Sequence, residues 1–304
     1  MKLKVRFVQT RSASVKQNTN RPMSMNSYIS NLLFRPPKPL PTYEELRTSH
    51  NSHARVTDAC HELYLTTKIP SVCCEHPEAQ MVIVYSHGNN ENIASCAWFV
   101  AELSRTFKAD VFAFEYAGYF AHREDSLPTA PSESGCFDAS AVFVGHLARR
   151  ERETRDLPVV LVGYSLGCAV ALHAADVHRR DDFPAAVLLM APFVSAASVV
   201  LAPRSWMLSL TPFYSAVDVF CMRTAALRNG HCLFVAHGTS DEVIPTSHGR
   251  AIAQWAAQHS PKNVEFYEVP DATHASLRLR GEVYEKFQRF LGPRLMQQQR
   301  ANDD

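Results

Sequence analysis

The chain has 304 residues, of which 46% are hydrophobic and 20% are charged, so it can bury a core and does not have the composition of a disordered protein. Lys and Arg number 31 against 30 Asp and Glu. A balance this even lacks the basic field by which proteins bind nucleic acids, and no nucleic-acid partner is expected. Eight cysteines, none of them spaced as CxxC, indicate neither a disulfide scaffold nor a structural zinc site. A reducing, cytoplasmic location is expected.

Charge is nevertheless distributed unevenly along the chain. Residues 1–43 contain eight Lys or Arg and no Asp or Glu, which leaves 23 basic against 30 acidic residues in the remainder. This composition predicts a disordered basic leader that attracts the chain to anionic membrane surfaces as a peripheral protein. A mitochondrial transit peptide is the minority alternative. We expect one α/β domain over residues 44–292 and a polar tail over residues 293–304.

Beyond the leader, short apolar strands alternate with helical patterns. The expected strands cover residues 61–66, 81–85, 111–114, 159–162, 185–189, 232–236 and 264–269. The expected helices cover residues 92–107, 132–152, 168–178, 249–259 and 277–291. Such alternation predicts an α/β fold, in which a mostly parallel sheet carries helices on both faces. Residues 194–228, between two strands, are expected to form a small lid or cap.

One uncharged stretch, residues 183–203, has the length of a membrane span. Pro184 and Pro192 lie within it, and an internal proline breaks a helix. The stretch therefore predicts a buried strand followed by a short helix.

The motif that indicates chemistry is GYSLG, at residues 163–167, which follows the apolar run VVLV and precedes small residues. A serine between a strand and a helix sits in strained backbone, and Gly163 and Gly167 remove the side chains that would clash there. The hydroxyl then lies at the start of a helix, whose dipole favours negative charge. We predict that Ser165 is a nucleophile. Because GxSxG also occurs by chance, an ordinary turn is the alternative.

A serine hydroxyl needs a histidine to accept its proton and an acid to orient that histidine. When a nucleophile follows a strand in this way, the acid and then the histidine come later in the chain. Asp241 is the first acid after the strand 232–236, with Glu242 as its neighbouring competitor, and His274 follows the last strand. The predicted triad is therefore Ser165, His274 and Asp241.

Other polar residues near these positions are expected to have structural roles. His237 and His248 lie near the acid loop, whereas His173 and His178 lie on the helix after Ser165 and should face away from it. Asp271 is expected in a turn.

An acyl-transfer site also needs N–H donors for the oxyanion of the tetrahedral intermediate. The run MVIVYSHGNN, at residues 81–90, has the form of a strand that ends in a turn. We assign the donors to the backbone of Asn89 and of Leu166, which follows the nucleophile.

Taken together, YSHGNNENI, FAFEYAGY, GYSLG, HGTSDEVIPTSHG and the late His274 resemble the α/β-hydrolase-domain-containing protein 17 family, membrane-associated thioesterases that remove palmitate from protein cysteines. The similarity covers roughly residues 33–291, including FRPPKPLPTY. HGTSDEVI followed by SHG is its most discriminating part, whereas GYSLG is shared by many lipases, esterases and peptidases. The resemblance implies an α/β-hydrolase fold and the same triad.

The chain departs from that family at several points. The family begins with an acylated cysteine cluster, but residues 1–59 contain no cysteine. The adjacent pair Cys73 and Cys74 is expected in a turn between two edge strands. Tyr164 is common in broader esterase and peptidase groups, and residues 120–123 (FAHR) replace a turn with glycine and serine. These differences leave substrate identity open.

The expected activity is serine hydrolysis through an acyl-enzyme, with an S-acylated protein or a lipid ester as substrate and a palmitoyl-protein thioesterase as the leading interpretation. An apolar groove near residues 195–210 is expected to hold the acyl chain. The alternatives are a serine peptidase of the prolyl-oligopeptidase type, a general lipid esterase, and an inert binding module with the same fold. Neither a metal nor an organic cofactor is expected.

Overall fold

The computed structural model describes residues 34–38, 69–119, 130–179, 183–201 and 219–303. The leader, except for residues 34–38, and the expected strand at 61–66 lie outside the described residues. Within the described part, seven strands form one sheet in the order β1-β3-β2-β4-β5-β6-β7, and all neighbours are parallel except β1 and β3. The strands are β1 (Ser71–Cys74), β2 (Met81–Ser86), β3 (Ala109–Phe114), β4 (Val159–Tyr164), β5 (Ala186–Met190), β6 (Cys232–Gly238) and β7 (Val264–Val269).

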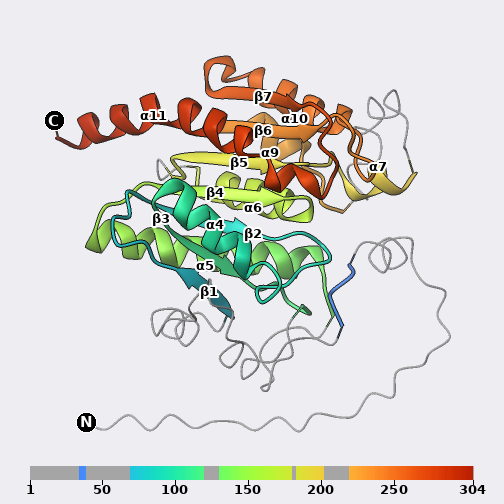
Figure 1. Cartoon of the computed structure of the whole chain (residues 1–304), viewed down its shortest axis with the longest axis horizontal. Coiled ribbons are helices and arrows are strands. Elements are labelled where there is room, and N and C mark those ends of the chain that lie inside the picture. Colours follow the sequence, from blue (N-terminus) through green and yellow to red (C-terminus); the bar gives the residue numbers. More distant parts are fainter. Residues whose placement is uncertain (1–33, 39–68, 120–129, 180–182, 202–218, 304) are drawn as a thin grey trace, which may run out of the picture.

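Helices cover both faces of this sheet (Figure 1). The α-helices are α4 (Ala97–Phe107), α5 (Glu133–Thr154), α6 (Leu166–Val177), α7 (Ala196–Leu201), α9 (Arg223–Arg228), α10 (Ser247–Ala257) and α11 (Gly281–Asp303), and the 3₁₀ helices are η2 (Pro261–Asn263) and η3 (Ser276–Leu279). Two apolar cores result. One lies under α4 and α11, and the other under α5, α6 and α10. This arrangement confirms the expected α/β class and mostly parallel sheet.

The central strands are buried on both faces, which explains their unbroken apolar sequences. Every residue of β2, β4 and β5 is buried. In the register of β2 with β4, Ser86 lies opposite Gly163. The two strands therefore end side by side, and the loop after β2 begins next to the GYSLG turn.

Three expected elements differ from the structure. Cys73 and Cys74 end β1, so the turn expected for this pair is wrong; pairing with β3 makes the segment an edge strand. The helix expected over residues 92–107 starts at Ala97. Asn92 accepts a hydrogen bond from the Ser95 backbone N–H through its side chain, and Ser95 Oγ accepts one from the Asn92 N–H. Such local bonds compete with helix formation.

At the C-terminal end, the single helix expected over residues 277–291 is instead the 3₁₀ helix η3 followed by α11. Helix α11 continues beyond Pro293 to Asp303, so it includes nearly all of the segment expected as a polar tail.

The uncharged stretch at residues 183–203 forms β5 and then α7, as expected, and residues 202 and 203 lie outside the described part. In the described ranges, no helix has the length and apolarity needed to cross a bilayer. The expected lid region contains α7 and α9, and its residues 202–218 are not among those described.

Candidate active site

Ser165 lies in the turn between β4 and α6, with a φ of 52° and a ψ of −117°. A positive φ is unusual for a residue with a side chain and is strained. The neighbouring glycines explain why the turn can form. A Cβ on Gly163 would lie 2.5 Å from the Gly167 carbonyl oxygen, and a Cβ on Gly167 would lie 1.9 Å from that of Ser86. Both positions therefore require glycine.

The structure brings Ser165 together with the predicted histidine and acid. His274 Nε2 lies 3.2 Å from Ser165 Oγ, and His274 Nδ1 lies 2.8 Å from Asp241 Oδ2. These three residues come from the loops that follow β4, β6 and β7. Because their strands are parallel, the loops meet at one edge of the sheet.

Hydrogen bonding determines which nitrogen of His274 carries the proton in its neutral form. Burial alone would raise the pKa of Asp241, but hydrogen bonds with His237 and His274 hold it well below its usual range. An ionised carboxylate only accepts hydrogen bonds. Nδ1 therefore donates to Asp241, and Nε2 is left to accept the proton of the Ser165 hydroxyl.

The loop that carries Asp241 holds the carboxylate at several points. Oδ1 of Asp241 accepts hydrogen bonds from the backbone N–H groups of Val243 at 2.9 Å and Ile244 at 2.8 Å. Glu242, the competing acid, accepts instead from the His274 backbone N–H at 3.2 Å. Its position supports the sequence-based choice of Asp241 as the partner of the imidazole.

His237 and His248, two of the four histidines that were expected to have structural roles, contact backbone groups. His237 is fully buried, and its Nε2 lies 2.8 Å from the Ile244 carbonyl and 3.4 Å from Asp241 Oδ2. This second contact with Asp241 was not expected from sequence. His248 is also buried, and its Nδ1 accepts a hydrogen bond from the Val194 N–H at 3.1 Å.

The other two histidines, on or just after α6, face away from Ser165 as expected. His173 stacks on Phe137 of α5, and His178 Nε2 lies 3.1 Å from the Ala141 carbonyl. Asp271 occupies a turn with a φ of 53°.

A buried pair, His87 with Glu115, holds the loop after β2 in place. His87 Nε2 lies 2.9 Å from Glu115 Oε1, and both side chains are fully buried. Burial disfavours the charged imidazole, but Glu115 outweighs it and raises the pKa of His87. The second carboxylate oxygen of Glu115 accepts from the Ile93 N–H at 3.0 Å. The pair thus holds both ends of the loop to which the expected oxyanion donor belongs.

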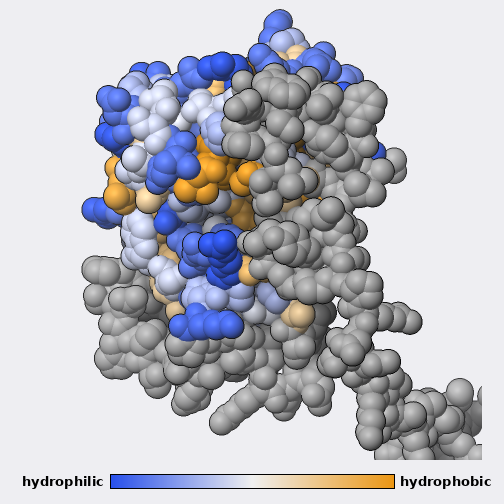
Figure 2. All heavy atoms as spheres, turned by 90° about the vertical axis from the view of Figure 1, so that its right-hand side faces the viewer, coloured by the Kyte–Doolittle hydropathy of each residue, from blue (hydrophilic) through white to orange (hydrophobic). Residues whose placement is uncertain are grey.

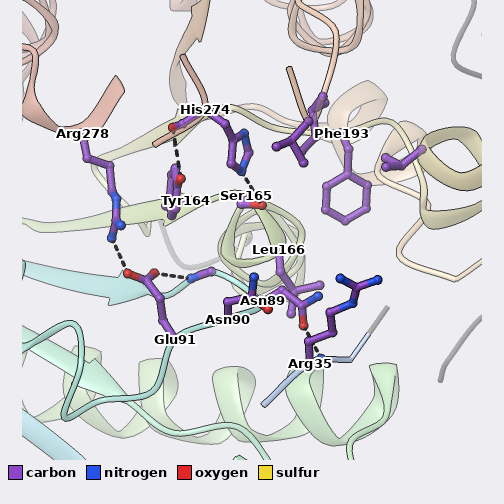
Figure 3. A pocket seen from close by; sticks show the side chains of 14 residues that line it. Arg35, Asn89, Asn90, Glu91, Tyr164, Ser165, Leu166, Phe193, His274 and Arg278 are labelled. Atoms are coloured by element: carbon purple, nitrogen blue, oxygen red, sulfur yellow. Dashed lines mark hydrogen bonds and ion pairs between the residues drawn. The ribbon is translucent and has the colours of Figure 1, made fainter. Parts of the chain in front are cut away.

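A cavity of ≈ 420 Å³ opens beside Ser165 (Figure 3). Both expected oxyanion donors, Asn89 and Leu166, lie in its wall next to Ser165 and His274. The complete lining comprises Arg35, Gly88, Asn89, Asn90, Glu91, Tyr164, Ser165, Leu166, Phe193, Val199, Val243, Ile244, His274 and Arg278. A groove was expected near residues 195–210, of which 202–210 lie outside the described residues; within the described part of that region, Val199 belongs to the lining.

Sequence reasoning missed a charged contact between the two sides of this site. Arg278 Nη1 lies 2.5 Å from Glu91 Oε1, and each side chain is 13% exposed. Glu91 also accepts a hydrogen bond from the Gly88 N–H at 2.9 Å. The Arg278 guanidinium lies 4.1 Å from the centre of the Tyr164 ring, and the Tyr164 hydroxyl donates to the His274 carbonyl at 3.0 Å. No motif in the sequence indicated this contact between residues 187 positions apart.

The sequence of the chain is similar to those of known proteins. A family model described as "Alpha/beta hydrolase family" matches residues 83–225. The chain has the α/β-hydrolase fold that its sequence predicted. Sequence comparison also confirms the expected resemblance to the α/β-hydrolase-domain-containing protein 17 family. The chain is 26% identical to alpha/beta hydrolase domain-containing protein 17B of Homo sapiens over 222 residues, which are 72% of this chain and 69% of that protein. It is 27% identical to alpha/beta hydrolase domain-containing protein aho-3 of Caenorhabditis elegans, over 88% of this chain and 78% of that protein.

Solved structures share the fold of this α/β hydrolase. A soluble variant of monoglyceride lipase from Saccharomyces cerevisiae aligns with a TM-score of 0.55 and 14% identity, over 74% of this chain and 92% of that one. An esterase from Pyrococcus furiosus aligns with a TM-score of 0.53 and 14% identity, over 74% and 85%. At this identity, the likeness supports the architecture alone.

Replacing Gly167 with alanine should disrupt the turn, because the new methyl group would overlap the Ser86 carbonyl. We expect Gly167→Ala to lower the free energy of unfolding by about 3 kcal/mol or more. Gly230→Ala is the matched control, since a Cβ there meets nothing within 4 Å. Urea denaturation of both variants would measure the difference, and equal stability would contradict the close packing of α6 on β2.

Breaking the contact between Glu91 and Arg278 should leave a charge unpaired in a mostly buried position. We expect Arg278→Met and Glu91→Gln each to destabilise the fold by about 3 kcal/mol. The double variant should lose much less than the sum of the two, because both changes remove the same interaction. Urea denaturation of the three variants would measure this coupling, and strict additivity would contradict it.

Protonation of His248 should make the fold acid-sensitive. Burial, the main cause, lowers the pKa of His248 from 6.5 to about 4. The unfolded chain therefore binds more protons here, so this contribution to stability is complete above pH 6.5 and is lost as the pH falls toward 4. We expect His248→Asn to remove about 2 kcal/mol of the stability difference between pH 7 and pH 4.5. Urea denaturation at both pH values would measure it.

The exposed His259, just after α10, supplies the control for this pH experiment. His259→Asn should keep the acid sensitivity of the wild type. If His248→Asn keeps it as well, the neutral buried form of His248 is not its source.

Proposed function

We propose that this α/β hydrolase is a serine hydrolase that removes long-chain acyl groups from protein cysteines through an acyl-enzyme on Ser165. The observation that carries the proposal is the hydrogen-bonded series Ser165, His274 and Asp241 at the wall of a cavity. The match to the α/β-hydrolase family model and the resemblance to named α/β hydrolases support a hydrolase. The thioester substrate rests on the resemblance to the domain-containing protein 17 group and on the apolar wall of the cavity.

In the first step, His274 Nε2 takes the proton of the Ser165 hydroxyl while Oγ attacks the thioester carbonyl carbon. Asp241 stabilises the resulting imidazolium through Nδ1. The negative charge on the carbonyl oxygen is met by the backbone N–H groups of Asn89 and Leu166. When the intermediate collapses, the carbon–sulfur bond breaks and the departing thiolate receives the proton from His274.

In the second step, the same imidazole takes a proton from water, which attacks the acyl group on Ser165. The carbon–oxygen bond to the serine breaks, the fatty acid leaves, and the proton returns to Ser165 Oγ. These steps need no metal or organic cofactor. Among the described residues, no group of His, Cys, Asp and Glu is arranged to hold a metal ion.

The shape and polarity of the cavity support an acyl substrate. The apolar side chains of Phe193, Val199, Val243 and Ile244 belong to its lining, and Val243, on the same loop as Asp241, is 52% exposed. Figure 2, which faces the end of the molecule where α7 lies, shows apolar residues gathered between hydrophilic ones. An acyl chain placed along Phe193 and Val199 would have its carbonyl near Ser165, which lines the same cavity.

A serine-reactive fluorophosphonate tests the nucleophile directly. Wild type should be labelled, Ser165→Ala should lose the label, and Ser195→Ala should keep it, because the Ser195 side chain is buried and capped by the Ser198 N–H. Absence of label on the wild type would favour an inert binding module over an enzyme.

The substrate class is tested by comparing turnover of long-chain acyl thioesters, oxygen esters and peptides. We expect the thioesters to be cleaved fastest. Faster cleavage of peptides would favour a peptidase of the prolyl-oligopeptidase type, and faster cleavage of oxygen esters would favour a general lipid esterase.

We also propose a cytoplasmic location, with the basic leader drawing the enzyme to anionic membranes. Residues 1–43 carry eight basic and no acidic side chains, each worth at most about 1 kcal/mol near such a surface. Deleting residues 1–24 should weaken binding to vesicles that contain phosphatidylserine. Unchanged binding would contradict this role, and mitochondrial import of the full chain would favour the transit-peptide alternative.

A further inference from the structure

Two arginines lie in the wall of the cavity, and their surroundings differ. Arg278 is paired with Glu91 and covered by the Tyr164 ring. Arg35 is exposed, and in the described ranges no carboxylate forms an ion pair with its guanidinium. Among the described residues, the lining therefore includes one arginine whose charge is compensated and one that is exposed to solvent (Figure 3).

The segment that carries Arg35 is held in place by two kinds of contact. Phe34 is buried and packs edge-on against Tyr119 and Phe220, with ring centres 6.4 and 5.7 Å apart. The Arg35 N–H donates to Asn89 Oδ1 at 2.9 Å, and the Tyr119 hydroxyl donates to the same oxygen at 2.6 Å. The side chain of Asn89 thus fixes the backbone of Arg35 at the loop that carries an expected oxyanion donor.

The lining of the cavity has a polar part and an apolar part. In Figure 3, Arg35 lies near Asn89 and Leu166, and Phe193 lies above it on the same side of Ser165, so the polar and apolar parts of the lining are separate. An acyl chain placed along Phe193 and Val199 directs the other substituent of the carbonyl, the leaving thiol, toward the polar part. A guanidinium there matches a carboxylate or a phosphate, which it can bind through two parallel hydrogen bonds.

We propose that Arg35 binds an anionic group on the leaving-thiol side of the substrate. The enzyme then selects thioesters whose thiol portion carries a negative charge near the scissile bond, such as an acidic group beside an acylated cysteine. This inference rests on the proposed thioesterase function and adds a rule of selectivity to it. Exposed ion pairs are modest in strength, so the rule is a preference among substrates rather than an absolute requirement.

A matched pair of small substrates tests the preference. S-octanoyl thioglycolate and S-octanoyl thioglycolamide have the same acyl chain and the same scissile bond, and differ in the charge on the thiol portion. We expect wild-type kcat/KM to be about two- to fivefold higher for the carboxylate. The preference should shrink at high salt, because an exposed ion pair is screened.

Variants of Arg35 then show whether its guanidinium causes the preference for the carboxylate. Arg35→Met should abolish the preference by lowering kcat/KM for the carboxylate more than for the neutral amide, and Arg35→Glu should reverse the preference. Arg149→Met is the control, because Arg149 is also exposed but lies near the end of α5, away from the cavity. It should retain the wild-type preference.

Three outcomes would overturn the inference. Equal wild-type turnover of the two thioesters contradicts it and leaves the proposed function intact. An Arg35-dependent preference for a carboxylate at the far end of the acyl chain, tested with a suberoyl thioester of thioglycolamide, would place the anion on the acyl side instead. Turnover of neither octanoyl thioester would contradict the proposed function and this inference together.

Discussion

The close approach of α6 to the ends of β2 and β4 is the constraint on which the site depends. Gly163 and Gly167 permit it, because a side chain at either position would overlap backbone atoms. The same approach holds Ser165 at a positive φ and places its side chain beside the loop after β2. Backbone strain of this kind persists only when the surrounding packing over-determines it. The buried strands on both sides of β4 supply that packing.

Two buried pairs of oppositely charged groups lie around the site in the described part of the chain. Glu115 compensates His87 beneath the loop after β2, and Glu91 compensates Arg278 between that loop and η3. Uncompensated charges in such positions would be costly. Both pairs join segments that are distant in sequence, so they connect the loops that must align around Ser165. Arg35 differs because it lies where solvent or a substrate can compensate it.

Asn89 connects the loop after β2 to the segment that carries Arg35. Its backbone is an expected oxyanion donor, and its side-chain oxygen holds both Arg35 and Tyr119. The loop after β2 therefore connects the proposed chemistry at Ser165 to the segment that we propose selects the leaving group. A substitution of the Asn89 side chain would remove the acceptor shared by Arg35 and Tyr119, a role that sequence reasoning had not indicated.

Local sequence predicted six of the seven described strands, all but β1, and pointed to Ser165, Asp241 and His274, which the structure brings together. Strand periodicity, the flanking glycines and the chain order of an elbow motif are local properties. The predicted ends of helices were less accurate where side chains form hydrogen bonds with the nearby backbone, as at Asn92 and Ser95. Tertiary structure alone decided which charges meet. The contacts of Glu91 with Arg278, His87 with Glu115 and Arg35 with Asn89 join residues at least 28 positions apart. Such contacts arise from the parallel crossovers and leave no periodic pattern in the sequence.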